Sequence, residues 1–295
     1  DEAESILMTF FRQGAGRSDP DVVARAARAG QALGRPHDAN SLFRSASTAV
    51  GGDPAIDTQH ALLFLDRFDE AEAERRLKLV IEADPQWAPA YAGLGWAVAD
   101  INPPAAAAAA MKALEIDPTL DSALLLLAHL DLDNTRVDSA RERLATLLEE
   151  NPNHLDARAL VAAMAYVKDD RATYDKEVAG LLAINPKFGE VYRVAGDLAA
   201  RNYRFDEAVA LARQATELDP SSARAFADLG MHLLRTGHEE EARTALEQSF
   251  SLDRFNRVTY NLLTLLDKLD GFTVVKDGDV IVKMDPDEAP VLREY

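Results

Sequence analysis

Five prolines recur along the chain at intervals of 33, 34, 34 and 34 residues: Pro85, Pro118, Pro152, Pro186 and Pro220. Each of them closes a stretch of helix-forming residues, and each is followed within a few residues by another apolar, helix-forming stretch. A fixed period of this length is the signature of stacked structural repeats. The spacing therefore predicts an all-α solenoid built from two-helix units.

A single register carries this period through most of the chain. Units that begin near residues 20, 54, 88, 121, 155, 189 and 223, with a last helix from 257, keep the register with one residue missing from the third unit. Small residues then occupy the eighth position of nearly every unit: Ala27, Ala61, Gly95, Ala128, Ala162, Gly196 and Gly230. A second small position falls near the middle: Ala39, Ala73, Ala106, Ala140, Ala208 and Ala242. Small residues at these two places let the two helices of a unit approach closely.

The residues at this register resemble a known repeat family. The stretch NYRFDEAVALARQATELDP (202–220), with the helix before it, resembles a tetratricopeptide repeat, and so do 88–118, 118–152 and 220–253. The resemblance covers residues 20–270 and implies a superhelical solenoid of about seven helix-turn-helix units. Tyr174 replaces the small residue of the fifth unit, which predicts that its second helix splays or repacks.

Both ends of the chain depart from the repeat. Residues 3–13 have helical periodicity, so we expect residues 1–19 to form a capping helix or the second helix of an incomplete unit. The chain starts at Asp1 without a methionine or a signal peptide, which favours a processed chain or an excised piece of a longer protein. Residues 272–276 and 280–284 are rich in β-forming residues and flank an Asp-Gly pair, which predicts a β-hairpin. A helix start follows at Pro286, so residues 271–295 are expected to begin a further domain.

A second resemblance concerns this tail. GFTVVKDGDVIVKMDPDEAPVLREY resembles the junction at which some bacterial tetratricopeptide repeat proteins continue into a zinc-peptidase-like domain of the peptidase MA (gluzincin) type. The resemblance implies a metalloprotease-like module downstream. Its His-Glu-x-x-His zinc helix matches no residues of this chain, and the nearest string, at His238, lacks the second histidine.

Composition excludes several other classes of function. The net charge of −18, from 50 acidic and 32 basic residues, argues against nucleic acid or an anionic membrane as the main partner. No apolar run approaches the roughly 20 residues of a membrane-spanning helix. Cysteine is absent, none of the six histidines is spaced three or four residues from another, and no phosphate-binding loop or nucleophile elbow occurs. We therefore predict no catalysis, no metal and no cofactor.

What remains is binding. The family resemblance implies that the first helices line a concave groove, and the candidates that face it on this register are Trp96, Leu125, His129, Leu132, Tyr166, Arg193, Arg201, Arg224, Met231 and Arg235. An apolar stripe suits a peptide or an amphipathic helix, whereas clustered arginines favour an acidic or C-terminal carboxylate segment.

Each group of candidates has an alternative interpretation. Trp96 and Tyr166 could be buried between neighbouring units, and Arg193 and Arg201 could pair with Asp197 at helical spacing. The two-lysine, two-asparagine clamp with which some members of the family hold chaperone tails is not matched. Three functions stay open: a protein-interaction scaffold, the substrate-recruiting or regulatory arm of a larger zinc-peptidase-like protein, and a structural spacer or oligomerisation module.

Overall fold

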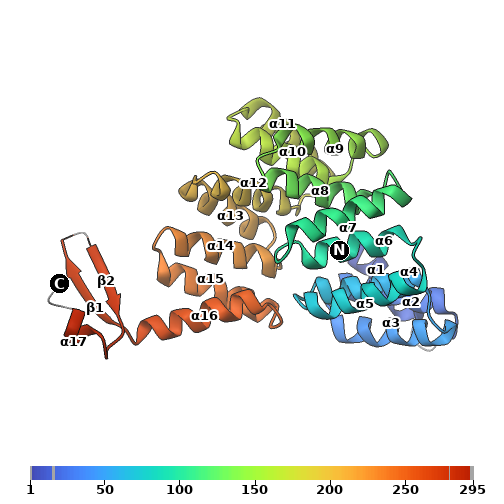
Figure 1. The fold of residues 1–295 in the computed structure, drawn as a ribbon, viewed down its shortest axis with the longest axis horizontal. Coiled ribbons are helices and arrows are strands. Elements are labelled where there is room, and N and C mark those ends of the chain that lie inside the picture. The colour runs from blue at the N-terminus through green and yellow to red at the C-terminus, as the bar shows by residue number, and fades with distance from the viewer. Residues whose placement is uncertain (1, 15–16, 279, 293–295) are drawn as a thin grey trace. The chain divides into compact units, whose positions relative to one another are not determined.

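The computed structural model describes residues 2–14, 17–278 and 280–292. Within them, 17 helices and one two-stranded antiparallel sheet follow one another (Figure 1). The chain divides into two compact parts, Asp1–Ala157 and Arg158–Tyr295, each containing several two-helix repeats. We call these two parts the first unit and the second unit. Among the residues described, none of the helices combines the length and the apolar character that crossing a bilayer requires.

The first unit contains nine complete helices: α1 (Glu2–Gly14), α2 (Pro20–Ala32), α3 (Pro36–Val50), α4 (Pro54–Leu65), α5 (Glu70–Ala83), α6 (Ala88–Val98), α7 (Pro103–Ile116), α8 (Asp121–Asp133) and α9 (Val137–Glu150). The division between the units falls inside α10 (Leu155–Val167). The second unit continues with α11 (Arg171–Ile184), α12 (Glu190–Arg201), α13 (Phe205–Leu218), α14 (Ala223–Arg235), α15 (Glu239–Leu252), α16 (Arg257–Asp270), β1 (Thr273–Asp277), β2 (Val280–Met284) and α17 (Ala289–Leu292).

The even-numbered helices from α2 to α16 are the first helices of the units. Each begins at the residue that the repeat register predicts or one residue from it. The small residues at the eighth position lie where the two helices of a hairpin cross. A Cβ added to Gly95 would lie 2.6 Å from Leu126 Cδ2 and 3.0 Å from the Ala106 carbonyl oxygen. A Cβ added to Gly230 would lie 2.6 Å from Leu246 Cγ, so no larger side chain fits at these crossings.

The second helices from α5 to α15 end in a common turn, whereas α3 ends at Gly51 with a left-handed φ of 74°. Asp84 lies before a proline and is extended, with φ −136° and ψ 92°, and its side chain accepts a hydrogen bond from the Gln86 amide at 3.0 Å. Asp253 has no proline after it, yet it adopts φ −142° and ψ 103° and accepts from the Phe255 amide at 3.0 Å. The Asx turn therefore stops the helix even where the closing proline is missing.

The turn between the two helices of a unit also repeats. Phe68, Thr135, Asp169 and Tyr203 all have φ between 57° and 62°, in the left-handed region. Gly34 and Gly237 hold the equivalent place in their units. This conformation is strained for residues other than glycine, so the close packing of the helices imposes it.

The two ends of the chain are packed against their neighbours. Phe11 of α1 lies 3.0 Å from the place where a Cβ on Gly30 of α2 would stand, and Arg35 lies 5.0 Å above the Phe11 ring. At the other end β1 and β2 pair from Thr273↔Met284 to Asp277↔Val280, which confirms the predicted hairpin. Lys283 of β2 forms an ion pair with Glu239 of α15. Residues 15–16, 279 and 293–295 of the predicted terminal segments lie outside the described residues.

Candidate protein-binding surface

In the first unit, an aromatic pair joins two successive first helices. Trp96 on α6 donates from Nε1 to the Ser122 carbonyl oxygen of α8 at 3.0 Å. Its ring meets His129 edge-on, with the centroids 5.5 Å apart at 72°. Leu125 is half-buried beside them, whereas Leu132 is only 9% exposed and offers little surface to a partner. Three of the four candidates in this unit therefore reach the surface. Trp96 also packs between two neighbouring two-helix repeats, because it bonds from α6 to α8.

In the second unit, Arg193 on α12 is held by three carboxylates. Its guanidinium donates to Glu190 at 2.7 Å and, through Nη1, to Asp197 and Asp228 at 2.9 Å each. The Arg193 side chain is only 12% exposed. Asp228 lies on α14, so this arginine ties two successive first helices together. It positions its neighbours, and its guanidinium is already fully engaged.

The carboxylates around Arg193 differ in their protonation. Burial opposes the ionisation of Glu190 and Asp197, but the hydrogen bonds and charge of Arg193 at Glu190, and the nearby His232 and Arg193 at Asp197, keep the pKa of both carboxyls below the usual value. Burial, together with the negative charge of Asp197, raises the pKa of Asp228 to about 6. Asp197 and Asp228 thus share one guanidinium, and Asp228 is the carboxyl that takes up a proton first, as the pH falls through about 6.

His232 on α14 is a buried neighbour of Asp197 in this network. It is 2% exposed, and its Nε2 lies 3.5 Å from Asp197 Oδ1. Within the described residues neither ring nitrogen has a hydrogen-bond partner of good geometry. His232 and Asp228 are not among the site residues predicted from the sequence. Their signal was a set of charged residues at facing positions one repeat apart, which local spacing on one helix does not reveal.

The remaining arginine candidates are exposed. The charge of Arg224 lowers the pKa of Glu190, and the charge of Arg235 lowers the pKa of Asp197. Both arginines therefore lie near the Arg193 network. Arg201 is exposed at the end of α12, and Met231 is half-buried on α14. Arg224 lies in the first turn of α14 and Arg235 at its last residue, so the two arginines flank the Arg193 network from opposite ends of this helix.

Tyr166 lies in a different environment. Its hydroxyl donates to Glu207 of α13 at 2.7 Å, and Arg204 lies 5.2 Å from the ring centroid. Its ring packs edge-on against Tyr174, with the centroids 5.0 Å apart, and Tyr174 is 4% exposed. Burial and the Glu207 contact raise the pKa of Tyr166 to about 12. Tyr166 therefore packs against Tyr174 and α13, which accommodates the large residue at position 174.

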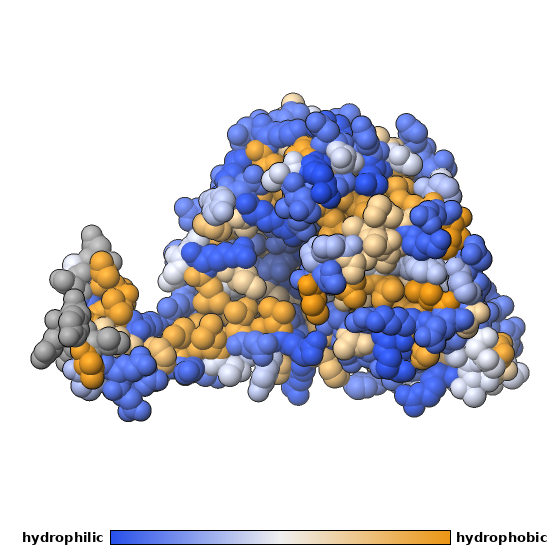
Figure 2. Space-filling view, in the orientation of Figure 1, coloured by the Kyte–Doolittle hydropathy of each residue, from blue (hydrophilic) through white to orange (hydrophobic). Residues whose placement is uncertain are grey.

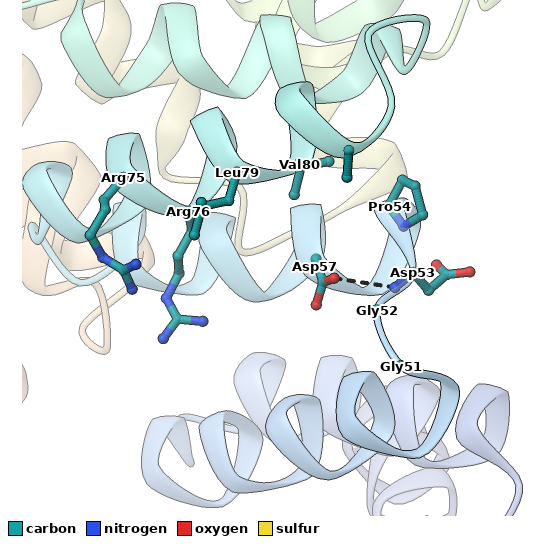
Figure 3. Close-up of a pocket in the computed structure, with 10 residues that line it drawn as sticks. Gly51, Gly52, Asp53, Pro54, Asp57, Arg75, Arg76, Leu79 and Val80 are labelled. Carbon is teal, nitrogen blue, oxygen red and sulfur yellow. Dashed lines mark hydrogen bonds between the residues drawn. The ribbon is translucent and has the colours of Figure 1, made fainter.

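Two cavities lie outside these clusters or beside them. One of about 310 Å³ opens in the first unit between α5 and the start of α4 (Figure 3). There the Asp57 carboxylate accepts the Asp53 amide at 3.2 Å, and Asp53 caps the helix, so the amides at this helix start are satisfied by the chain itself. Another cavity, of about 280 Å³, lies in the second unit, with Glu190 and Arg193 in its wall. In the part of the chain that the structure describes, no three His, Asp or Glu side chains form a group that could hold a metal ion.

These repeats have relatives of known class. The family model described as tetratricopeptide repeat matches residues 97–164 and 199–264. One similar solved structure is the crystal structure of a tetratricopeptide repeat protein from Parabacteroides merdae ATCC 43184. The two sequences are 15% identical, the alignment covers 85% of this chain and 100% of that one, and the TM-score is 0.52. The fold is therefore that of a tetratricopeptide repeat solenoid.

A larger assembly offers a second structural neighbour. The crystal structure of the APC/C hetero-tetramer Cut9-Hcn1 is 17% identical over 83% of this chain, with a TM-score of 0.54, and this chain spans 49% of that one. No curated protein sequence matches the chain. None of these comparisons supports the resemblance of residues 271–295 to a peptidase MA junction.

Proposed function

We propose that this chain is a non-catalytic protein-interaction scaffold that binds a peptide or helix segment of a partner. The binding surface is the first-helix face, formed by the even-numbered helices from α2 to α16. Tetratricopeptide repeat proteins generally mediate protein–protein interactions, and their fold is typically a scaffold without catalytic groups. The observation that carries the proposal is the arrangement of Arg224 and Arg235 beside the buried Arg193 network, in a chain with a net charge of −18.

Charge supports an acidic segment as the ligand. Arg201, Arg224 and Arg235 are exposed cations on α12 and α14, whereas Arg193 is engaged internally and supports their backbone. Guanidinium groups bind carboxylates with paired hydrogen bonds, so an acidic or C-terminal segment suits this face. In the first unit Trp96, Leu125 and His129 offer an apolar contact instead.

The proposal is tested by site-specific photo-cross-linking of the whole chain in an extract of the organism that encodes it. Benzoylphenylalanine replaces Leu125 or Arg224 on first helices, and the exposed Ala145 or Gln214 on second helices as matched controls. We expect a discrete protein adduct from the first-helix positions and none of the same mass from the controls. Equal adducts from both faces, or none from the first helices, would reject the scaffold function.

A further inference from the structure

The last first helix, α16, carries an apolar row on the face where α14 is polar. Four side chains lie 34 residues after Arg224, Asp228, Met231 and Arg235, and all four are apolar: Val258, Leu262, Leu265 and Leu269. We call these four the α16 stripe. Val258 is 50% and Leu265 is 49% exposed, and the other two are half-buried. Figure 2 shows apolar side chains gathered over α16.

The fully buried residues of α16 lie outside the α16 stripe. The packing face of the helix carries Thr259 and Leu266, which are 0% and 2% exposed. Ser249 of α15 donates to the Ala223 carbonyl oxygen at 2.8 Å, and its hydroxyl lies 3.2 Å from that of Thr259. The starts of α14 and α16 therefore meet at Ser249, and the stripe is left outside this contact. A row of exposed apolar side chains that the fold does not need is typical of a binding surface.

The charged side chains of α16 are divided between its faces. The acidic residues of α16 are turned to the α15 side, where Asp267 and Asp270 accept from Arg243 at 2.6 and 2.7 Å. Four exposed cations lie on these two first helices, Arg257 and Lys268 on α16 and, one repeat before Val258 and Leu269, Arg224 and Arg235 on α14. We call these four the basic rim. In a chain with a net charge of −18, four exposed cations on these two helices favour an acidic ligand.

We propose that the α16 stripe and its basic rim dock an amphipathic helix of a partner protein, with leucine-like residues on the stripe and acidic residues toward the rim. The stripe has spacings of four, three and four residues, the pattern of a helix-on-helix seam. A second copy of this chain fits less well, because a two-fold contact through α16 would place one basic rim against the other. The inference rests on the proposed scaffold function and names the partner at one end of it.

The test uses a fluorescent, acetylated and amidated peptide with leucine at heptad positions a and d and glutamate elsewhere. Its binding to the whole chain is followed by fluorescence anisotropy, beside a peptide with lysine in place of glutamate and one of scrambled order. We expect the acidic heptad peptide to bind at least about tenfold more tightly than either. Chemical-shift changes at the Leu265 methyl groups should accompany its binding.

Two sets of variants locate the interaction. Val258→Asp with Leu265→Asp should weaken the acidic peptide at least about tenfold, because charge replaces the exposed apolar contact. Leu79→Asp with Ile184→Asp, at 52% and 47% exposed positions of second helices, is the matched control and should leave binding unchanged. Arg257→Glu with Lys268→Glu should reverse the preference between the glutamate and lysine peptides. Thermal melting by circular dichroism verifies that each variant is folded.

Four results would overturn the inference. They are equal affinity for the scrambled peptide, an equal loss in the control variant, a dimer in sedimentation that Val258→Asp with Leu265→Asp converts to monomer, and flotation with anionic phosphatidylglycerol vesicles that the same variant abolishes. The third would assign the stripe to a second copy and the fourth to a membrane surface. Cross-links that persist from Leu125 while the peptide fails would leave the scaffold function standing and reject only the α16 site.

Discussion

The first helices of the two units carry different chemistry on equivalent positions. Trp96 and His129 hold the ninth position of their repeats in the first unit, and Asp197 holds it in the second. The first pair meets through aromatic rings 5.5 Å apart, whereas Asp197 accepts a hydrogen bond from Arg193 at 2.9 Å. The repeat thus fixes where a side chain stands, and the side chain alone decides what that position can bind.

The two faces should also respond differently to change. The aromatic face of the first unit is stabilised by dispersion and by burial of apolar area, so its loss is graded with the atoms removed. The charged face of the second unit depends on complete pairing, because removal of one ion leaves the others buried and uncompensated. Its stability should therefore be more sensitive to single substitutions and to pH.

The largest effect is expected from Arg193→Met. The substitution keeps most of the apolar volume but strands Glu190, Asp197 and Asp228, and should lower the free energy of unfolding of the second unit by about 3–5 kcal/mol. Hydrogen exchange of α12 and α14 amides measures the loss. Arg201→Met, at the exposed end of α12, is the control and should stay within about 0.5 kcal/mol. Similar losses in the two variants would contradict the distinction between buried and exposed arginines.

In the first unit, Trp96→Ala should cost about 2–4 kcal/mol, since it removes an aromatic contact and a hydrogen bond between α6 and α8. Trp96→Phe keeps a ring and should recover most of this, leaving about 1 kcal/mol for the lost bond to Ser122. Urea unfolding at low and high salt measures both. A strong salt dependence of the Trp96→Ala loss would show that the two faces do not differ as described.

The next largest effect is the pH dependence of the stability of the second unit, which we expect from Asp228. The raised pKa of Asp228 means that the folded state holds its proton up to about pH 6, while the unfolded state releases it near its ordinary value. Stability from this group is present at low pH and falls as pH rises through about 6. Asp228→Asn should therefore stabilise the second unit by about 1–2 kcal/mol at pH 8 and much less at pH 5. A variant that destabilises equally at both pH values would remove this assignment.

The smallest effects test what the units share. Thr135 and Tyr203 hold the same left-handed turn, with φ of 58° and 62°, in the first and second units. Thr135→Gly and Tyr203→Gly should each raise the free energy of unfolding by about 0.5–1 kcal/mol, because glycine adopts this conformation without strain. Thermal unfolding provides the measurement. A gain in one unit and a loss in the other would show that the turns are not equivalent.

Much of the fold could be predicted from the sequence, because helix crossings and turns are determined within a single two-helix repeat or hairpin. The small residues such as Gly95 and Gly230 mark helix crossings, and residues 273–277 pair with 280–284 in the expected hairpin. The structure also accommodates Tyr174 by packing it against Tyr166. The site was less accessible to sequence reasoning. Leu132 turned out to be almost buried, and Tyr166 faces Glu207 of the next second helix.

The period, the small-and-large alternation and the Asx turns before the prolines are local properties, and they alone determined that this chain stacks helical hairpins. Tertiary structure decided which arginines are buried in an ion-pair network and which are exposed. Arg193 meets Asp228, 35 residues further along, only because two hairpins stack with their first helices adjacent. Electrostatic pairing depends on distance in space, which separation along the chain does not report, so the same arginine-rich pattern contains one internal ion pair centre and several exposed cations.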